Sequence, residues 1–300
     1  MSFEDDGRQE RLTGPDPRQL AQAFLAACED ELRAPKPGNV HVFAAGHGME
    51  VKDFIDSAHV AAAPLTTPGV NVGARIFAAV EATYARVGQN TNLGIILLCA
   101  PLAQAALDFP GEDLRTGVAR VLKGLTRADA ELAFKGIARA NPGGLGAAPR
   151  HDVTEPARVT LLEAMRASAD RDRIAYQYAH DFEDVLVLGR GSLFAARGEG
   201  YSEGMTTLRV YLGFLAAFPD SHVTRKFGAD AGALVRAEAR AFAASLDTKK
   251  SDEEVTAAAL RWDASLKERG LNPGTSADLT VATLFADYVA CVLANACKNG

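Results

Sequence analysis

The sequence lacks the motifs of the common nucleotide-binding and hydrolase folds. It contains no GxGxxG, GxxxxGK[ST] or GxSxG segment, and its six histidines form no HExxH arrangement. These absences disfavour dinucleotide-binding folds, P-loop proteins, serine hydrolases and zinc hydrolases. The cysteines Cys28, Cys99, Cys291 and Cys297 form no CxxC pair and lie in stretches rich in Ala and Leu. We expect them to be small buried hydrophobic residues rather than metal ligands.

An excess of basic residues is also missing. The 32 Lys and Arg stand against 38 Asp and Glu, a net charge of −6, which argues against a surface that coats nucleic acid or anionic lipid. The N-terminal segment is acidic and polar where a signal peptide is basic and then apolar, so we expect a cytoplasmic protein. The longest apolar run, 94–107, is shorter than the roughly 20 residues of a membrane span and contains Pro101. We therefore expect neither a nucleic-acid nor a membrane partner.

Long β-branched alternations are absent, whereas apolar residues recur at helical spacing along most of the chain. The pattern predicts an all-α fold, a single globular domain of about ten packed helices over residues 18–300 that follows a mobile tail at 1–17. The 300 residues, 48% of them hydrophobic, are enough to bury a full core. Helices are expected at 19–34, 51–63, 73–86, 95–107, 112–123, 127–140, 158–188 with a possible break, 203–218, 231–246, 252–269 and 276–297.

Five segments between these helices are unusually rich in Gly, Pro, Asn and His. Glycine permits close approach of the backbone, and Asn, Asp, Ser and Thr supply hydrogen-bond donors and acceptors, so such loops suit a polar ligand. Any one of them is equally well explained as an ordinary helix cap, but the five together favour a binding site. They are residues 36–49, 87–94, 141–153, 219–228 and 271–279.

Three groups of residues in or near these loops are candidates for chemistry. Lys36 stands between two prolines and is followed by Gly38, an arrangement that suits a phosphate. The pair Arg225-Lys226 follows Asp220, the minimum set for gripping a metal-bound polyphosphate, although a solvated helix start explains it equally well. Asp278 falls in the first turn of the last helix, where it either caps that helix or forms one wall of a pocket. Asp172, between two arginines, is read as part of a surface charge cluster.

Several of these segments together resemble the triphosphoribosyl-dephospho-CoA synthase family, over about residues 25 to 290. That family is all-helical and moves the triphosphoribosyl part of ATP onto 3′-dephospho-CoA with release of adenine, to make a prosthetic-group precursor for acyl carrier proteins of citrate and malonate lyase type. The residues that carry the resemblance are KPGNV at 36–40, His47 and Met49, Ser57-Ala58, Asn90-Thr91 with Gly94, Asp220 with Arg225-Lys226 and Gly228, and NPGTSADL at 272–279.

The resemblance implies ATP as a substrate, Mg²⁺ on its triphosphate, and a carboxylate that stabilises the oxocarbenium-like centre or takes the hydroxyl proton. Asp220, Asp278 and His47 are then the expected catalytic residues, and Asp220 and Asp278 also the expected metal ligands. The residues expected to bind the nucleotide are Lys36, Gly38, Asn90, Thr91, Arg225, Lys226, Gly274 and Ser276.

The chain departs from the family pattern at several positions. Asn92 and Leu93 replace a histidine and a lysine, His41 replaces an acidic residue, and Gly48 replaces an aspartate. The sequence is thus similar to a divergent branch found in archaea and in oxidisers of methyl compounds. Two alternatives therefore stay open: an enzyme of methanofuran or methanopterin biosynthesis that acts on another phosphorylated substrate, and a non-catalytic ligand-binding or scaffold protein. The Ala-rich helical surface also allows a homodimer.

Overall fold

The computed structural model describes residues 14–46, 48–143, 150–246 and 251–299. Within these residues it contains fourteen α-helices and one π-helical segment, and its only extended pairings are two isolated β-bridges. The predicted all-helical, single-domain fold is confirmed. The elements are α1 (Pro17–Arg33), α2 (Val51–Thr66), α3 (Val72–Val87), α4 (Leu93–Asp108), α5 (Leu114–Lys123), α6 (Arg127–Ala140), α7 (Leu161–Arg166), α8 (Arg173–Ala179), η1 (Asp184–Gly189), α9 (Arg190–Gly198), α10 (Glu203–Ala217), α11 (Ser221–Phe227), α12 (Ala229–Ser245), α13 (Asp252–Glu268) and α14 (Gly274–Asn299).

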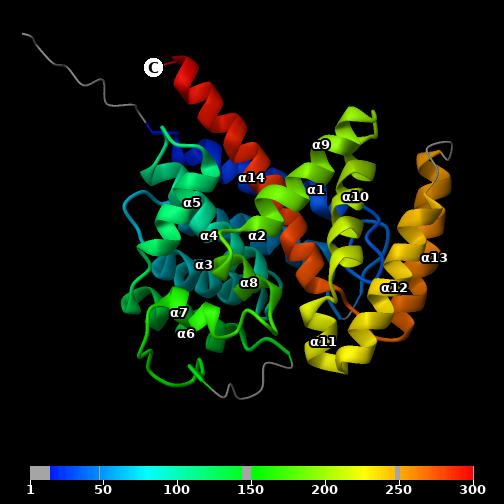
Figure 1. Cartoon of the computed structure of the whole chain (residues 1–300), viewed down its shortest axis with the longest axis horizontal. Helices are drawn as coiled ribbons and strands as arrows, with labels where there is room; N and C mark the ends of the chain where they lie inside the picture. The colour runs from blue at the N-terminus through cyan, green and yellow to red at the C-terminus, as the bar shows by residue number, and fades with distance from the viewer. Residues whose placement is uncertain (1–13, 47, 144–149, 247–250, 300) are drawn as a thin grey trace, which may run out of the picture.

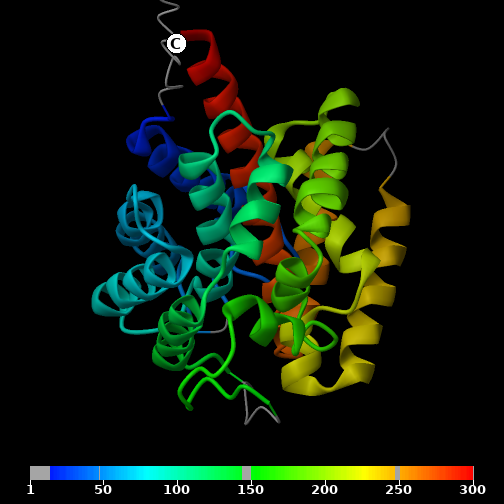
Figure 2. The ribbon, with the colours of Figure 1, turned by 60° about the vertical axis from the view of Figure 1, so that its left-hand side comes forward.

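Two helices, α10 and α14, link two hydrophobic clusters. The larger cluster joins α1 to α9 with most of α14, and the smaller one joins α10 to α13 with the first turn of α14. Figure 1 shows α14 running diagonally between the helices α3 to α8 on one side and α10, α12 and α13 on the other. The view in Figure 2 agrees, because the same helix again separates the two groups. The N-terminal end of α14 is therefore placed where the two groups of helices meet.

The helix α14 is long and apolar enough to cross a membrane by length and composition. An 18-residue window within Gly274–Ala296 has a mean hydropathy of 1.6, and 67% of that window is buried inside the protein. Contacts with α1, α4, α10 and η1 cover it. Its apolar composition is therefore explained by its position in the protein core.

The structure differs from the sequence prediction most clearly between residues 158 and 202. A single helix with a possible break was expected over 158–188, but the chain forms α7, α8 and η1, which continues directly into α9. Asp172 caps α8 by accepting hydrogen bonds from the N–H groups of Ile174 and Ala175. Asp181 and Phe182 then adopt positive φ angles of 49° and 57°, which an α-helix cannot continue. The helix count is thus higher than the ten or so that periodicity predicts.

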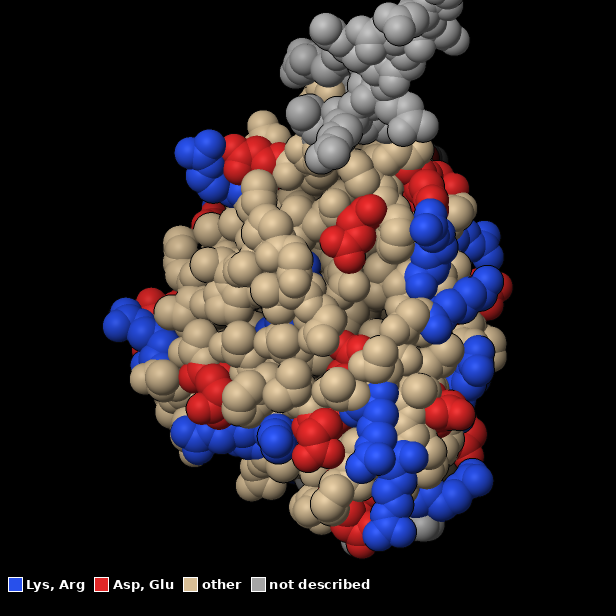
Figure 3. Space-filling model, turned by 90° about the vertical axis from the view of Figure 1, so that its left-hand side faces the viewer, with Lys and Arg blue, Asp and Glu red and all other residues tan. Residues whose placement is uncertain are grey.

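The helices begin close to the predicted end of the N-terminal tail, and two cysteines lie in the core. Residues 1–13 of the predicted tail and His47 lie outside the described residues, and α1 already begins at Pro17 with Asp16 as its cap. Cys28 and Cys99 are buried, as predicted, but Cys291 is exposed, because it lies on the solvent side of α14. Figure 3 shows one face of the surface, on which acidic and basic side chains are interspersed around a largely uncharged centre.

Candidate active site

A cavity of about 430 Å³ lies where the two groups of helices meet. Each of the five segments that were predicted to suit a polar ligand contributes to its wall. The residues that represent them are Asn39 and Met49, Asn90 to Gly94, Pro142 and His151 to Val153, His222 with Thr224 and Arg225, and Asn272, Gly274, Thr275, Ala277 and Asp278. Residues as far apart in the sequence as Asn39 and Asn272, which are separated by 233 positions, therefore share one site.

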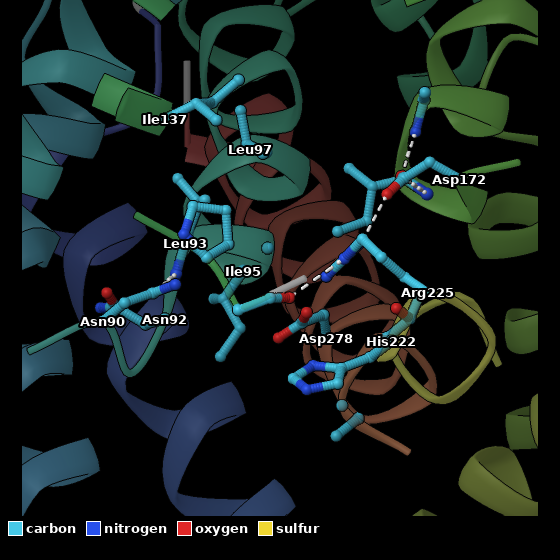
Figure 4. Close-up of a pocket in the computed structure, with 18 of the residues that line it drawn as sticks. Asn90, Asn92, Leu93, Ile95, Leu97, Ile137, Asp172, His222, Arg225 and Asp278 are labelled. Atoms are coloured by element: carbon cyan, nitrogen blue, oxygen red, sulfur yellow. Dashed lines mark hydrogen bonds and ion pairs between the residues drawn. The ribbon is translucent and has the colours of Figure 1, made fainter. Parts of the chain in front are cut away.

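The cavity has a polar end and an apolar end. In Figure 4, Asp278, His222, Arg225 and Asp172 lie together, and the side chains of Leu97 and Ile137 lie away from them. The apolar end is completed by side chains from α6 and α7, namely Phe134, Ala164 and Met165. Such an arrangement suits a ligand with one charged and one uncharged part.

Asp278 stands in the first turns of α14, as the sequence predicts, and lines the cavity rather than capping its helix. Its carboxylate packs against Gly94 in the first turn of α4, where a Cβ atom would collide with it. Burial raises the pKa of Asp278 well above its usual value, and the negative charges of Glu31, Asp220 and Asp172 raise it further, whereas Arg225 lowers it. A carboxyl of this kind keeps its proton to a higher pH than an exposed aspartate does and can release it to a substrate.

Arg225 lines the cavity from α11 and is held by two oxygens. Its Nη1 lies 3.1 Å from Oδ2 of Asp172, and its Nε donates to the carbonyl of Gly143 at 3.3 Å. Asp172 also lines the cavity, so the prediction of a surface charge cluster is corrected for this residue. Asp172 lies at the cavity because its Oδ1 caps the first turn of α8, and that turn lines the cavity.

Asp220 lies beside the cavity but is not part of its wall. Its Oδ1 accepts hydrogen bonds from the N–H groups of His222 and Val223, and its Oδ2 accepts from both the N–H and the hydroxyl of Ser276, each at 2.8 Å. Burial raises the pKa of Asp220, which these hydrogen bonds partly offset. Asp220 therefore fastens the start of α11 to the start of α14, and Ser276 is its partner in that contact.

Lys36 and Gly38 are placed behind the cavity wall. The buried ammonium of Lys36 contacts Glu31 at 2.7 Å, the carbonyl of Val40 at 2.7 Å and Oδ1 of Asn39 at 3.3 Å. The N–H of Gly38, which was expected to face a phosphate, donates to Asp263 at 2.8 Å. Gly38 has a φ of +82°, and a side chain there would collide with Pro273, so the glycine brings this loop against the start of α14.

The remaining predicted site residues divide into two sets. Asn90, Thr91 and Gly274 line the cavity together with Arg225 and Asp278. Lys226 points elsewhere, with its ammonium 5.4 Å from the centre of the Phe227 ring. The catalytic and binding roles assigned from the sequence remain predictions for all of these residues.

Glu31 was missed in the sequence, although it lines the cavity from α1. It is buried, with 4% of its surface exposed. A signal was available, since Glu31 follows Phe24, Ala27 and Cys28 at helical spacing and therefore sits on the apolar stripe of its helix. A carboxylate on such a stripe is expected to face a partner or a ligand.

No resident metal site is evident within the described residues. They contain no group of three or more His, Cys, Asp or Glu side chains placed to hold a metal ion. Asp220, one of the two predicted ligands, already uses both carboxylate oxygens in hydrogen bonds. The residues present do not fit a metal ion held by the protein alone.

Comparison with known proteins agrees with the resemblance found in the sequence. The model of the CitG family, described as ATP:dephospho-CoA triphosphoribosyl transferase, matches residues 17–295. A crystal structure from Archaeoglobus fulgidus, provisionally described as a triphosphoribosyl-dephospho-CoA synthase, has a similar fold with a TM-score of 0.62. The two chains are 22% identical, and the match covers 79% of this chain and 97% of the other. A search of curated proteins gave no match.

Proposed function

The chain belongs to the CitG family of ATP:dephospho-CoA triphosphoribosyl transferases, and we propose that its cavity transfers the triphosphoribosyl group of ATP to 3′-dephospho-CoA with release of adenine. Family membership makes the chain a transferase and disfavours the scaffold alternative. The observation that carries the proposal is the position of Asp278, a proton-holding carboxyl that faces a cavity built from the family's own sequence segments.

Binding of the phosphates is assigned to the polar end of the cavity. Arg225 and Arg171 supply its positive charge, and the long helices α4 and α14 both begin at its wall. N–H groups and the positive end of a helix favour an anion at such a position. We assign the triphosphate to Arg225 and the start of α4, where Asn90 and Thr91 complete the wall.

The bond that breaks joins the anomeric carbon of the ATP ribose to N9 of adenine, and a hydroxyl of the acceptor takes its place. Adenine leaves more readily when a proton is delivered to its ring as the bond breaks. Asp278 is the residue assigned to this step, because it faces the cavity and its raised pKa favours the protonated form. General acid catalysis of this kind contributes about 10² to 10⁴ in rate.

The apolar end of the cavity suits an uncharged part of a substrate, either the adenine ring or the pantetheine arm of the acceptor. The volume of the whole cavity, about 430 Å³, is within the usual range for one small-molecule ligand. Two large nucleotides do not fit inside it together. We therefore expect part of the acceptor to lie outside the cavity.

Magnesium, dimerisation and location are finer points of the same proposal. Because the described residues do not build a metal site, Mg²⁺ is assigned to the substrate, with which it enters as MgATP.

Three exposed apolar side chains, Val187, Leu188 and Phe194, lie on η1 and α9 and support a homodimer, which analytical ultracentrifugation would test. A cytoplasmic location remains our expectation from the composition.

The test is to measure adenine release from MgATP with and without 3′-dephospho-CoA and to identify the product by chromatography. Release that depends on the acceptor, with one adenine formed for each product molecule, is the expected result. If nucleotide binding raises the melting temperature but no adenine appears, the substrate differs, and intermediates of one-carbon-cofactor synthesis become the next compounds to test.

A further inference from the structure

Glu31 provides a further carboxyl in the cavity, besides those of Asp278, Asp172 and Asp152, and nothing in the sequence motifs assigns it. It reaches the wall from α1, whereas Asp278 reaches it from α14. Its Oε1 contacts the ammonium of Lys36 at 2.7 Å, and its other oxygen has no partner among the described residues. One oxygen is thus anchored and the other is available to a bound molecule.

The ammonium of Lys36 is held by three contacts, and the charged partner among them is Glu31. Both side chains of the pair are almost completely buried, with 0% of Lys36 and 6% of Glu31 exposed. The other contacts of the ammonium are neutral oxygens of Val40 and Asn39. Because an ammonium donates at most three hydrogen bonds, the lysine has no donor left for a substrate phosphate.

We propose that Glu31 is the general base of the transfer reaction and that Lys36 is its positioning residue. This inference rests on the proposed function, and it replaces the phosphate-binding role predicted for Lys36. The difference from Asp278 lies in the partners: Glu31 has a buried ammonium in contact, whereas Asp278 has no cation within ion-pair distance among the described residues. Of these two carboxyls, Glu31 is therefore the one that ionises more readily and can accept a proton.

In the proposed step, two protons move while one bond forms and another breaks. The hydroxyl proton of the acceptor passes to the free oxygen of Glu31 while the hydroxyl oxygen bonds to the anomeric carbon of the ATP ribose. The bond from that carbon to N9 breaks, its electron pair goes to adenine, and adenine takes the proton of Asp278. Glu31 then loses its new proton to water and Asp278 regains one, so no further reactant is consumed.

Other charged groups around the pair bear on its protonation. Burial raises the pKa of Glu31 above its usual value, and the charge and hydrogen bond of Lys36 offset part of this rise. Burial lowers the pKa of Lys36, and Asp263 and Lys267 on α13 act on it in opposite directions. The titratable neighbours that the charge of Glu31 affects are Cys28 on α1, Tyr211 on α10 and Asp278 on α14.

Four variants separate a catalytic role from a structural one: Glu31→Gln, Lys36→Met, the double variant Glu31→Gln/Lys36→Met, and the control Glu29→Gln. Glu29 lies on the same helix with 42% of its side chain exposed, and its one ion pair within the described part of the chain is with Arg33, so its replacement should leave activity unchanged. Removing one partner of a buried ion pair destabilises a protein strongly, whereas removing both is often close to neutral. The double variant is therefore expected to regain the melting temperature that Lys36→Met loses.

Activity is measured as acceptor-dependent adenine release, together with its pH dependence. Glu31→Gln and the double variant should lose about 100-fold or more in kcat, with KM for ATP changed by less than about threefold. In Lys36→Met, the acidic limb of the kcat/KM profile should move to higher pH, because Glu31 loses the charge that lowers its pKa. A merely structural pair would not move this limb.

Two results would overturn the inference, and they are distinguishable. Suppose that the wild type releases adenine with dephospho-CoA and that the folded double variant does so equally fast. Glu31 is then not the base, although the proposed function stands. If the wild type releases no adenine under any of these conditions, the proposed function fails and the role of Glu31 fails with it.

Discussion

The carboxylate of Asp278 rests against Gly94, so the first turns of α14 and α4 touch where α4 has no side chain. The start of α14 is itself fastened by Asp220 through Ser276 and by Asn39 through Asn272. A rigid helix start is a better support for a catalytic group than a loop is, because reaction rates depend on small displacements. This contact explains why a glycine stands at position 94.

Replacing Gly94 with alanine should displace Asp278 and lower kcat by about tenfold or more, since a shift of 1 Å can cost up to about 10²-fold. The added methyl group would also meet Ile174, so a loss of about 1 to 3 kcal/mol in stability is expected. Gly191→Ala is the matched control, because its methyl group enters open space on α9. That control should gain about 0.5 to 1 kcal/mol and keep full activity. Equal activity in both variants would contradict the prediction.

Arg225→Gln and Lys226→Gln test which residue of the adjacent basic pair binds the nucleotide. Arg225 lines the cavity, and Lys226 is exposed and directed at Phe227. Loss of a charge-assisted hydrogen bond costs about 1.5 to 3 kcal/mol, so KM for ATP should rise about tenfold to a hundredfold in Arg225→Gln. Lys226→Gln should bind ATP like the wild type, as isothermal titration would show. A larger effect at Lys226 would place the phosphates elsewhere.

Asp220 is expected to act on stability and not on metal binding. Asp220→Ala removes a helix cap and the two hydrogen bonds to Ser276, which should cost about 2 to 4 kcal/mol in denaturant unfolding. Asp220→Asn keeps an oxygen for the cap and should lose less. The Mg²⁺ concentration for half-maximal activity should be unchanged in Asp220→Asn; a rise would restore the metal role predicted from the sequence.

Asp278→Asn should abolish most of the activity yet raise the melting temperature at neutral pH. The pKa of Asp278 is raised in the folded state, so folding favours its protonated form. The ordinary pKa of an aspartate, 3.8, applies to Asp278 in the unfolded chain. Ionisation of Asp278 therefore destabilises the fold progressively as the pH rises from 3.8 through the pKa of the folded state. The gain from Asp278→Asn should be present at pH 7 and fade towards pH 4 in thermal melts of both proteins. An active variant would remove Asp278 from the mechanism.

Local signals in the sequence located much of the candidate site. Helical periodicity predicted α1 to α6, α10 and α12 to α14 closely, because each depends on residues three or four positions apart. It missed α11, which lies within the segment 219–228 that was expected to be a loop. The composition of five loops indicated a polar site, and all five border the cavity. The segment NPGTSADL indicated both the family and the helix turn that carries Asp278.

The break of the predicted helix at 158–188 was less visible, because it depends on left-handed conformations at Asp181 and Phe182. Neither residue is glycine, so composition gives little warning of a positive φ there. The continuation through a π-helical segment into α9 likewise has no simple sequence pattern.

The helical class, the family and the short list of polar loops follow from neighbouring residues and contiguous motifs, so they could be inferred without a structure. Which charged side chains face the cavity depends instead on the packing of the helices. Asp220 and Asp278 are alike in the sequence, but one bonds to Ser276, 56 residues away, and the other faces the cavity. Lys36 is likewise buried against Glu31 rather than offered to a phosphate. These choices depend on how distant helices pack, which local spacing does not encode.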